Sequence, residues 1–489
     1  MKETKKGPKI NKITRDLTTR DSLGIESVAT SISGEICPIV NTVTPRPFYW
    51  AFIMWGFYDF YNNCNTEDRK STNVYKYIKM QNYFLGLASV LINPEVSISF
   101  TGTETIKSKV NTEQEYYTYD ETYLKNISNM VYYPAGLYTM GLIVDENPET
   151  LEKYKYPHIT PSGERLAKAF DKVFSQTEYY KKYRNTGLNI PKNILIELGN
   201  AIKINLDGFD EVKNILKEYL FNRERNTKLI ESHNYLRYIF KTEKIENINT
   251  YSYRKIFYDY YSVRGDLKKK YPDELKEIID GWEIVIGRQY FTAGLEMIWK
   301  FMLECLNIPK TKENWFSTCI EESTFDFDIN GKLENIIKEC NFNFEEREKM
   351  ISNASSERLS HESNIENGIK IILSVYNRFI DRDDFSKDNL YFYNYGADRN
   401  SISFNDFFEI VKVYSTKSIK EFIIFIMNNY LLLQHLNTAF EKMIQGRDGY
   451  YVEKIENLYA RKEFFTLFFQ GIRMIQLTSV MRDLNILGE

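Results

Sequence analysis

The stretch from Gly136 to Phe170, GLYTMGLIVDENPETLEKYKYPHITPSGERLAKAF, constrains the fold more than any other part of the chain. A helix of small residues ends at Leu-Ile, a polar excursion follows, and Ile-Thr-Pro-Ser-Gly begins an amphipathic helix. Gly141 can adopt the backbone conformation that ends a helix, which bulkier residues resist. Pro161 suits a first helical turn, because the N–H that it lacks would have no partner there. This order predicts a helix, a two-stranded hairpin and another helix.

The same order is typical of a winged helix, in which three helices bury their apolar faces together and a two-stranded wing packs beside them. A helix is predicted over residues 120–130, and Pro134 is predicted to begin the next helix. Leu142 and Val144 begin the first strand of the wing, and Ile159 lies in the second. The buried face of the closing helix consists of Leu166, Phe170, Val173 and Phe174. A helix, loop and helix without a wing is the alternative, and the turn and cap signals favour the wing.

The charge of this segment bears on what the wing contacts. A recognition helix and wing that approach phosphates need a concentration of Arg and Lys. Residues 120–160 instead hold six carboxylates and three lysines. The acidic residues are Asp120, Glu121, Asp145, Glu146, Glu149 and Glu152, and the basic ones are Lys125, Lys153 and Lys155. The charge favours a winged helix that docks protein over one that docks DNA.

The strongest basic and aromatic stretch, YSYRKIFYDYYSVRGDLKKKY, runs from Tyr251 to Tyr271. It combines six basic and two acidic side chains with seven aromatic ones, so it could bind a phosphate backbone and stack on unpaired bases. The candidate nucleic-acid-binding residues are Arg254, Lys255, Arg264, Lys268, Lys269 and Lys270. An amphipathic helix with buried tyrosines and solvated charges explains the same residues. The general excess of tyrosine, 37 in the chain, favours that simpler interpretation.

Helical periodicity dominates the rest of the chain and predicts a mainly α, multi-domain protein. Its 489 residues exceed the roughly 250–300 that a single core accommodates. Apolar stripes predict helices after Pro47 and over residues 71–91, 193–200, 209–220, 226–240, 282–306 and 419–443. Strand signals are few and short, such as FDFDI near Phe325 and YYVEK near Tyr451.

These patterns predict five consecutive segments. Residues 1–20 form a basic flexible arm, and residues 21–185 form an N-terminal helical domain with the winged-helix-like unit. Residues 186–320 form a helical bundle, and residues 321–400 form an acidic, loop-rich segment with a short hairpin. Residues 401–489 form a C-terminal helical domain with a possible second winged-helix-like unit.

The chain carries no signal for export or membrane insertion. The N-terminal MKETKKGPKINKITR has positive charge without an apolar segment behind it. The two most apolar runs, PFYWAFIMWGFYDFY and FIIFIMNNYLLL, are shorter than the ~20 residues that span a bilayer. We therefore expect a cytoplasmic protein. Its net charge of −3 provides no global attraction to nucleic acid.

Motifs that carry chemistry are absent from the sequence. It contains no GxxxxGK[ST], HExxH or GxSxG, and its four histidines are isolated. The sharpest metal candidate is DFDINGKLENII, in which Asp326, Asp328, Asn330 and Gly331 match the first half of an EF-hand loop. Ile337 occupies position twelve, where a bidentate carboxylate is needed, so an Asn-Gly hairpin is the favoured interpretation. We predict no catalytic residue, no metal site and no cofactor, while a metal-dependent nuclease built from dispersed carboxylates stays open.

Three segments together resemble an uncharacterised group of bacterial proteins encoded in anti-phage defence clusters. They are TRDSLGIESVATSISGEICPIVNTVTPRPFYW, GLYTMGLIV with ITPSGERLAKAF, and IQLTSVMRDLNIL. The layout is also similar to kleisin subunits, although an extended linker is missing. The resemblance implies a subunit of a multi-protein defence system. The acidic charge of the winged-helix segment and the absence of catalytic motifs lead us to expect a non-enzymatic adaptor of an antiviral or DNA-surveillance complex, whose partner is an SMC-type ATPase or a nuclease. The alternatives are a metal-dependent nuclease effector and a DNA-binding transcriptional regulator.

Overall fold

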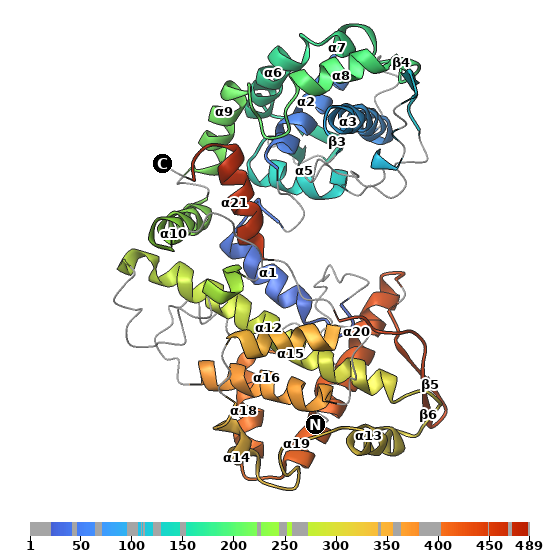
Figure 1. The fold of residues 1–489 in the computed structure, drawn as a ribbon, viewed down its shortest axis with the longest axis vertical. Helices are drawn as coiled ribbons and strands as arrows, with labels where there is room; N and C mark the ends of the chain where they lie inside the picture. The colour runs from blue at the N-terminus through green and yellow to red at the C-terminus, as the bar shows by residue number, and fades with distance from the viewer. Residues whose placement is uncertain are drawn as a thin grey trace, which may run out of the picture. The chain divides into compact units, whose positions relative to one another are not determined.

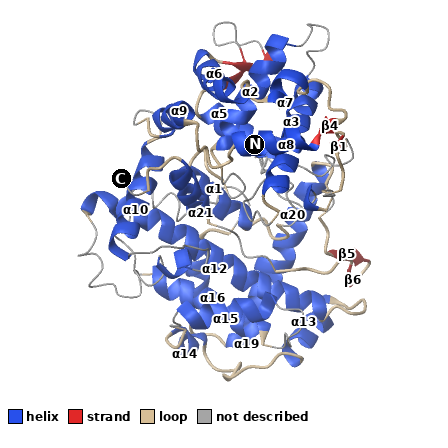
Figure 2. Ribbon diagram, turned by 45° about the horizontal axis from the view of Figure 1, so that its top comes forward, coloured by secondary structure: helices blue, strands red, loops and turns tan. Residues whose placement is uncertain are grey.

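The computed structural model describes residues 21–41, 46–63, 71–94, 106–108, 110, 113–120, 129–146, 153–222, 226–243, 252–256, 272–340, 344–355, 363–380, 402–447, 449–467 and 472–487. The fold is mainly helical, as predicted, and its few strands form three two-stranded pairs within these ranges (Figures 1 and 2). The chain divides into two compact units. Unit 1 comprises Met1–Ser33 and Tyr251–Gln470, and unit 2 comprises Gly34–Thr250 and Gly471–Glu489. The division falls within helix α1 (Glu26–Ile36).

The core of unit 1 is the 29-residue helix α12 (Lys276–Glu304), which follows the 3₁₀ turn η3 (Asp273–Leu275). Side chains on every face of α12 are buried, because other helices of the unit pack around it. This explains why the helix lacks the one-sided apolar stripe of a surface helix. Helices α13 (Lys312–Glu321), α15 (Phe344–Ser355), α16 (Asn364–Phe379) and the segment η5 (Ile426–Leu432) pack against α12. Helix α18 (Phe404–Tyr414) contacts the ring of Phe291 on α12, and α14 (Leu333–Ile337) packs on α16.

Glycines allow α12 and α16 to pack closely and antiparallel. A Cβ on Gly294 would lie 2.9 Å from the Gly368 carbonyl oxygen, and a Cβ on Gly368 would lie 2.5 Å from the Gly294 carbonyl oxygen. At Gly287 the ring of Phe379 fills the space that a side chain would need. Because backbone atoms occupy the first two positions, only glycine fits at this crossing.

Unit 2 is built around the apolar helix α2 (Phe48–Asn63), whose residues Phe48 to Phe57 are all buried. Helices α3 (Ser71–Ile92), α5 (Asn129–Thr139) and α6 (Pro161–Phe174) pack against α2. Rings of α2 and α6 meet directly: the centroids of Trp55 and Phe174 are 4.4 Å apart. The remaining elements are β1 (Tyr116–Tyr117), α7 (Glu178–Lys182), β4 (Ile190–Pro191), α8 (Lys192–Ala201), α9 (Asp210–Leu220), α10 (Thr227–Glu243) and α21 (Arg473–Asp483).

The hairpin predicted between two helices is present in unit 2. Strands β2 (Ile143–Glu146) and β3 (Lys153–Ile159) pair antiparallel between α5 and α6. Gly141 has a φ of +69°, the left-handed conformation expected at the end of α5. Thr160 caps α6, since its hydroxyl accepts a hydrogen bond from the Gly163 N–H at 3.2 Å.

Other parts of the winged-helix prediction differ or stay open. Pro134 lies inside α5, which begins at Asn129, and does not start that helix. Most of the helix predicted over residues 120–130 lies outside the described residues. The helix–hairpin–helix order is therefore observed, while assignment to the winged-helix fold remains a prediction.

The C-terminal hairpin predicted at YYVEK is observed as β5 (Val452–Ile455) and β6 (Leu458–Arg461). The hairpin predicted at FDFDI is not formed. Residues 323–331 contain no strand, and the Asp328 carbonyl accepts a turn hydrogen bond from the Gly331 N–H at 2.9 Å. The backbone of this turn bonds instead to the first turn of helix α19 (Ile419–Phe425), where the Ile419 N–H donates to the Gly331 carbonyl at 2.9 Å.

The two units also differ from the five consecutive segments expected. The described part of residues 321–400 contains α14, α15 and α16, and α16 packs along α12. A boundary at residue 320 therefore falls inside a packed core. Helix α21, expected in a C-terminal domain, belongs to unit 2 and is tied to its beginning by a 2.7 Å ion pair between Arg46 and Asp483.

None of the helices within the described ranges has both the length and the apolar content needed to cross a bilayer.

Candidate protein-docking surface

A long helix of unit 1 runs from Ile419 to Ile444, as its periodicity predicts. It consists of α19 (Ile419–Phe425), the π-helical segment η5 (Ile426–Leu432) and α20 (Leu433–Ile444). A capping box begins it: the Ser418 hydroxyl accepts from the Glu421 N–H at 3.2 Å, and the Glu421 carboxylate accepts from the Ser418 N–H at 3.0 Å.

The π-helical segment keeps one face of this helix buried along its whole length. An α-helix has 3.6 residues per turn, so a strict four-residue spacing drifts around it. The i→i+5 bonds of η5 widen one part of the helix and compensate for that drift. The buried residues at four-residue spacing are Ile419, Ile423, Met427, Leu431, His435 and Ala439, and also Phe422, Ile426, Tyr430, Gln434, Thr438 and Lys442.

The buried face of α20 contacts residues 21–23, which begin the described part of unit 1. The Lys442 ammonium donates to the Asp21 carbonyl at 2.5 Å, and the Gln434 amide donates to the Leu23 carbonyl at 2.9 Å. His435 Nε2 accepts from the Tyr451 N–H at 3.1 Å, which assigns the ring proton to Nδ1, 3.0 Å from the Ser22 carbonyl. Burial lowers the pKa of His435 to about 4, so the ring is neutral at pH 7.

A buried acidic group lies beside this contact. Glu296 of α12 is 1% exposed, and the carboxyl groups of Glu26 and Asp21 lie near its own. Burial, followed by the neighbouring carboxyl groups of Glu26 and Asp21, raises the pKa of Glu296 well above its usual value. The described residues contain no group of three or more His, Cys, Asp or Glu side chains arranged to hold a metal ion. The raised pKa of Glu296 favours its neutral, protonated form.

The outer face of α20 carries an exposed apolar stripe. Leu433, Phe440, Met443 and Ile444 are between 45 and 69% exposed, and Leu436 is partly exposed. The spacing 433, 436, 440 and 443 is that of the a and d positions of a heptad repeat. Contiguous exposed apolar side chains of this kind mark interaction surfaces. We call these five residues the α20 stripe.

The sequence predicts this helix but not its exposed stripe. Apolar residues occur on both faces of α20, so periodicity alone does not show which face the core covers. The heptad spacing of the second apolar set is the signal that could have pointed to a surface. The exposure of the α20 stripe can be recognised only once α12 and residues 21–23 are known to pack against the opposite face of α20.

Two of the six predicted nucleic-acid-binding residues are described, and both form ion pairs with α15. The Arg254 guanidinium is 2.9 Å from the Glu348 carboxylate, and the Lys255 ammonium is 2.6 Å from the Glu345 carboxylate. Arg254 is also buried, so its charge is directed at α15 and not at solvent. Arg264, Lys268, Lys269 and Lys270 lie outside the described residues. Nucleic-acid binding by this segment stays a prediction.

A small pocket adjoins the Arg254–Glu348 pair. Its volume is about 10 Å³, room for one water molecule. Arg347 donates to the Ser374 hydroxyl at 3.1 Å, Arg378 donates to the Glu283 carboxylate at 2.8 Å, and Tyr290 donates to Glu348 at 2.8 Å. The carboxylates of Glu283 and Glu348 each form an ion pair with an arginine. The side chains around the pocket therefore form an ion-pair network that joins α12, α15 and α16.

The EF-hand-like segment is also tied into the fold. Asp326 accepts a hydrogen bond from the Lys370 ammonium at 2.5 Å, and the Asp326 N–H donates to Glu366 at 2.8 Å. Although partial burial opposes it, the hydrogen bond from Lys370 lowers the pKa of Asp326. The Asp328 carboxylate accepts from the Asn330 N–H at 3.0 Å. These bonds hold Asp326 and Asp328 in place within the fold.

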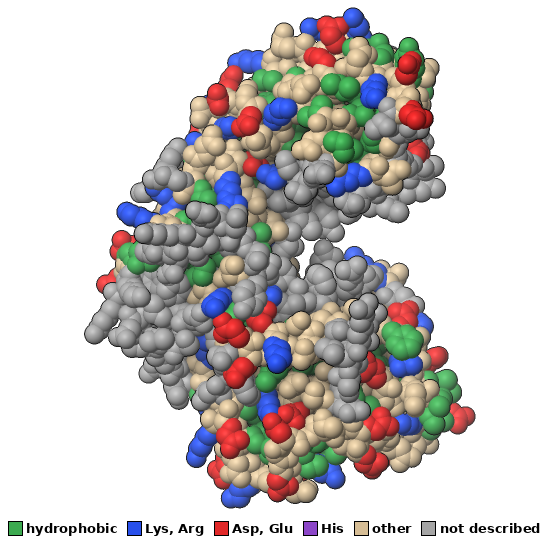
Figure 3. Space-filling view, viewed as in Figure 1, with side chains coloured by type: hydrophobic (Ala, Val, Ile, Leu, Met, Phe, Trp, Pro, Cys, Tyr) green, Lys and Arg blue, Asp and Glu red, His purple; other side chains and the backbone are tan. Residues whose placement is uncertain are grey.

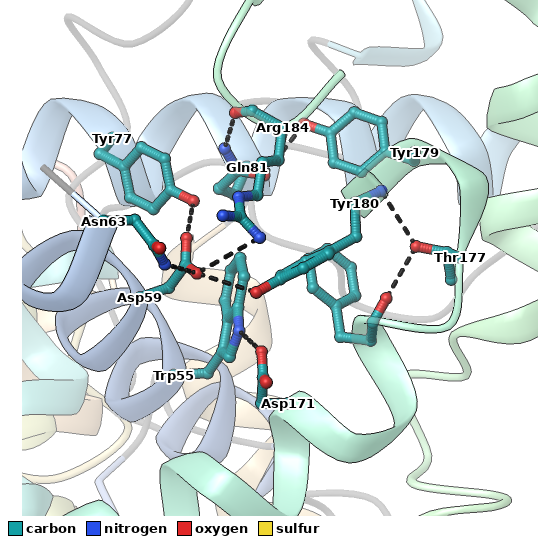
Figure 4. A network of polar contacts seen from close by, with 11 residues as sticks. Trp55, Asp59, Asn63, Tyr77, Gln81, Asp171, Thr177, Tyr179, Tyr180 and Arg184 are labelled. Atoms are coloured by element: carbon teal, nitrogen blue, oxygen red, sulfur yellow. Dashed lines mark hydrogen bonds and ion pairs between the residues drawn. The ribbon is translucent and has the colours of Figure 1, made fainter. Parts of the chain in front are cut away.

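Unit 2 contains a second buried polar network, centred on Asp59 of α2 (Figure 4). Its carboxylate accepts hydrogen bonds from Tyr77, from Asn63 at 2.6 Å and from Tyr180 at 3.1 Å. The Arg184 guanidinium lies 4.0 Å from the centre of the Tyr180 ring. These bonds join α2, α3 and α7, so the network stabilises the core of the unit.

The surface view shows no field of one sign. Lys and Arg side chains alternate with Asp and Glu over the coloured part of the face in Figure 3. This favours recognition by apolar contact over recognition by charge on that face. Comparison of the chain with family models, curated proteins and solved structures gives no match.

Proposed function

We propose that the protein is a non-enzymatic scaffold subunit of a bacterial multi-protein complex for antiviral defence or DNA surveillance. The observation that carries the proposal is the α20 stripe, which leaves four large apolar side chains about half exposed or more. Burial of such side chains against another subunit is favourable by about 25 cal/mol per Å² of apolar area removed from water. The resemblance of the terminal segments to defence-cluster proteins supplies the biological setting.

The heptad spacing of the stripe indicates an α-helix as the binding element. Side chains at a and d positions interdigitate with those of a facing helix and set a shallow crossing angle. Over Leu433–Ile444 the stripe is about 17 Å long, enough for three turns of a partner helix. Contact with nucleic acid through residues 264–270 would be a separate property of this scaffold.

A two-tag co-purification from cells that express the protein tests the proposal, because it detects both a different protein and a second copy of the chain. We expect wild type to retain a subunit at constant ratio and Phe440→Asp to lose it. Val413→Asp on α18 is the matched control, since Val413 is 58% exposed and Phe440 is 53% exposed. A ratio that Phe440→Asp leaves unchanged would contradict the proposal.

Enzymatic activity would contradict the non-enzymatic part of the proposal. Purified wild type is incubated with DNA, RNA and nucleoside triphosphates in the presence of Mg²⁺ or Mn²⁺. Hydrolysis that disappears in Asp326→Asn but persists in Phe440→Asp would identify a nuclease or nucleotidase in place of a scaffold.

A further inference from the structure

We propose that the α20 stripe is bound by a second copy of this chain, with the two α20 helices antiparallel about a two-fold axis. The inference rests on the proposed function, in which the stripe is buried against another subunit. It identifies that subunit and the geometry of the contact.

The spacing of the stripe carries the inference. The intervals between Leu433, Leu436, Phe440 and Met443 are three, four and three residues, a series that reads the same in both directions. When two such helices run antiparallel about a centre at residue 438, Leu433 faces Met443 of the second copy and Leu436 faces Phe440. A two-fold interface requires a surface that is its own complement, and four of the five stripe residues meet that condition. Ile444 has no counterpart, because position 432 opposite it is the buried Leu432. Its a positions also meet d positions, as in antiparallel coiled coils.

The polar border of the stripe is compatible with this arrangement. Asn437 and Gln445 are exposed and uncharged, and Lys442 points into the core. Glu441 is the carboxylate beside the stripe on α20, and it is partly exposed. Antiparallel packing separates the two copies of Glu441 by about 9 Å along the helix axis, whereas parallel packing in register would bring them side by side. Like charges therefore favour the antiparallel orientation.

The exposed area sets the expected strength of the contact. Large apolar side chains offer roughly 150–200 Å² each. With exposures between 45 and 69% for four of them, the stripe contributes about 400 Å² per copy. The resulting ~800 Å² is below the 1,200–2,000 Å² typical of stable complexes. We therefore expect a reversible dimer with a dissociation constant of about 10 μM.

Sedimentation velocity between about 1 and 100 μM measures this equilibrium. We expect Phe440→Glu and Leu436→Lys each to weaken self-association by tenfold or more, and Val413→Glu to leave it unchanged. A mixture of the two single variants then forms a heterodimer, because Lys at position 436 of one copy faces Glu at position 440 of the other. The second pair across the two-fold axis keeps the native Leu436–Phe440 contact. Circular dichroism confirms that each variant retains its helical content.

Recovery in the mixture supports the antiparallel pairing, because helices packed parallel do not place residue 436 opposite residue 440. Loss of association without recovery overturns it, and so does a dimer that Phe440→Glu leaves intact. A wild-type monomer at 100 μM also overturns it. If Phe440→Asp nevertheless removes a different co-purifying protein, the proposed scaffold function stands and the second-copy inference fails.

Discussion

The stability of unit 1 in Glu296→Gln, measured relative to wild type, should increase as the pH rises. Gln has nearly the shape of Glu but cannot ionise. In the folded protein, burial and the neighbouring carboxyls raise the pKa of Glu296 well above its usual value of 4.5. The unfolded chain therefore releases the Glu296 proton at a lower pH than the folded chain does. Between these two pKa values the folded state binds more protons, and its stability falls as pH rises.

The slope in that interval is about 1.4 kcal/mol per pH unit. From pH 4.5, the usual value for a Glu carboxyl, to pH 7, the difference between Glu296→Gln and wild type should grow by up to about 3 kcal/mol. For a unit of this size, 1 kcal/mol corresponds to roughly 2–4 °C in Tm, so this upper limit corresponds to a gain of about 6–12 °C at pH 7 relative to the offset at pH 4.5.

Hydrogen exchange of α12 peptides, followed by mass spectrometry from pH 4.5 to 8, isolates this effect from unit 2. At each pH the stability of wild type is subtracted from that of the variant. To first order, this subtraction removes the contribution of other titrating groups. Asp21, whose pKa burial also raises, is present in both proteins. A difference that is constant with pH, or that shrinks as the pH rises, would refute the argument that Glu296 is buried as a neutral acid.

Three further substitutions test the packing. Gly163→Ala should destabilise unit 2 by about 1–3 kcal/mol, because a Cβ there would lie 2.2 Å from the Leu142 carbonyl oxygen; an unchanged denaturation midpoint would count against this contact. Asp59→Ala should cost about 3 kcal/mol or more in urea unfolding, since it leaves the hydroxyls of Tyr77 and Tyr180 without their acceptor. Glu456 has a φ of +54°, so Glu456→Val should lower the stability of the β5–β6 hairpin by about 1 kcal/mol while Glu456→Gly should not; equal exchange rates in the two variants would contradict this.

Local signals predicted the parts of the fold that depend on neighbouring residues. The helix α6 follows from Thr160 and Pro161 at its start, and the end of α5 follows from Gly141. These residues act on backbone groups within one turn, so the sequence contains both partners of each interaction.

The hairpin predicted at residues 325–331 is not formed, because long-range contacts there outweigh the local signals. Asn330-Gly331 is a typical hairpin turn, yet the adjoining backbone bonds to a segment some 90 residues away: the Lys420 N–H donates to the Ile329 carbonyl at 2.8 Å. The same limit applies to Arg254 and Lys255. Their basic character is visible in the sequence, but the carboxylates that pair with them lie on α15.

Recognition of the α20 stripe depends even more on contacts between residues that are far apart in the sequence. Lys442 is buried because its ammonium donates to the carbonyl of Asp21, and this contact assigns the inner face of α20. Only then are Phe440 and Ile444 known to lie on the solvent side. Amphipathicity is a property of one helix, whereas exposure depends on what packs against it.

The division of the chain between its units has a consequence for synthesis and for engineering. Unit 1 includes residues 21–33, and unit 2 includes helix α21, whose Arg473 donates to the Val40 carbonyl at 2.8 Å. During translation, α21 of unit 2 is therefore synthesised only after the whole of unit 1. A single truncation leaves either unit without one of its helices, so producing one alone would call for a circularly permuted or fused gene.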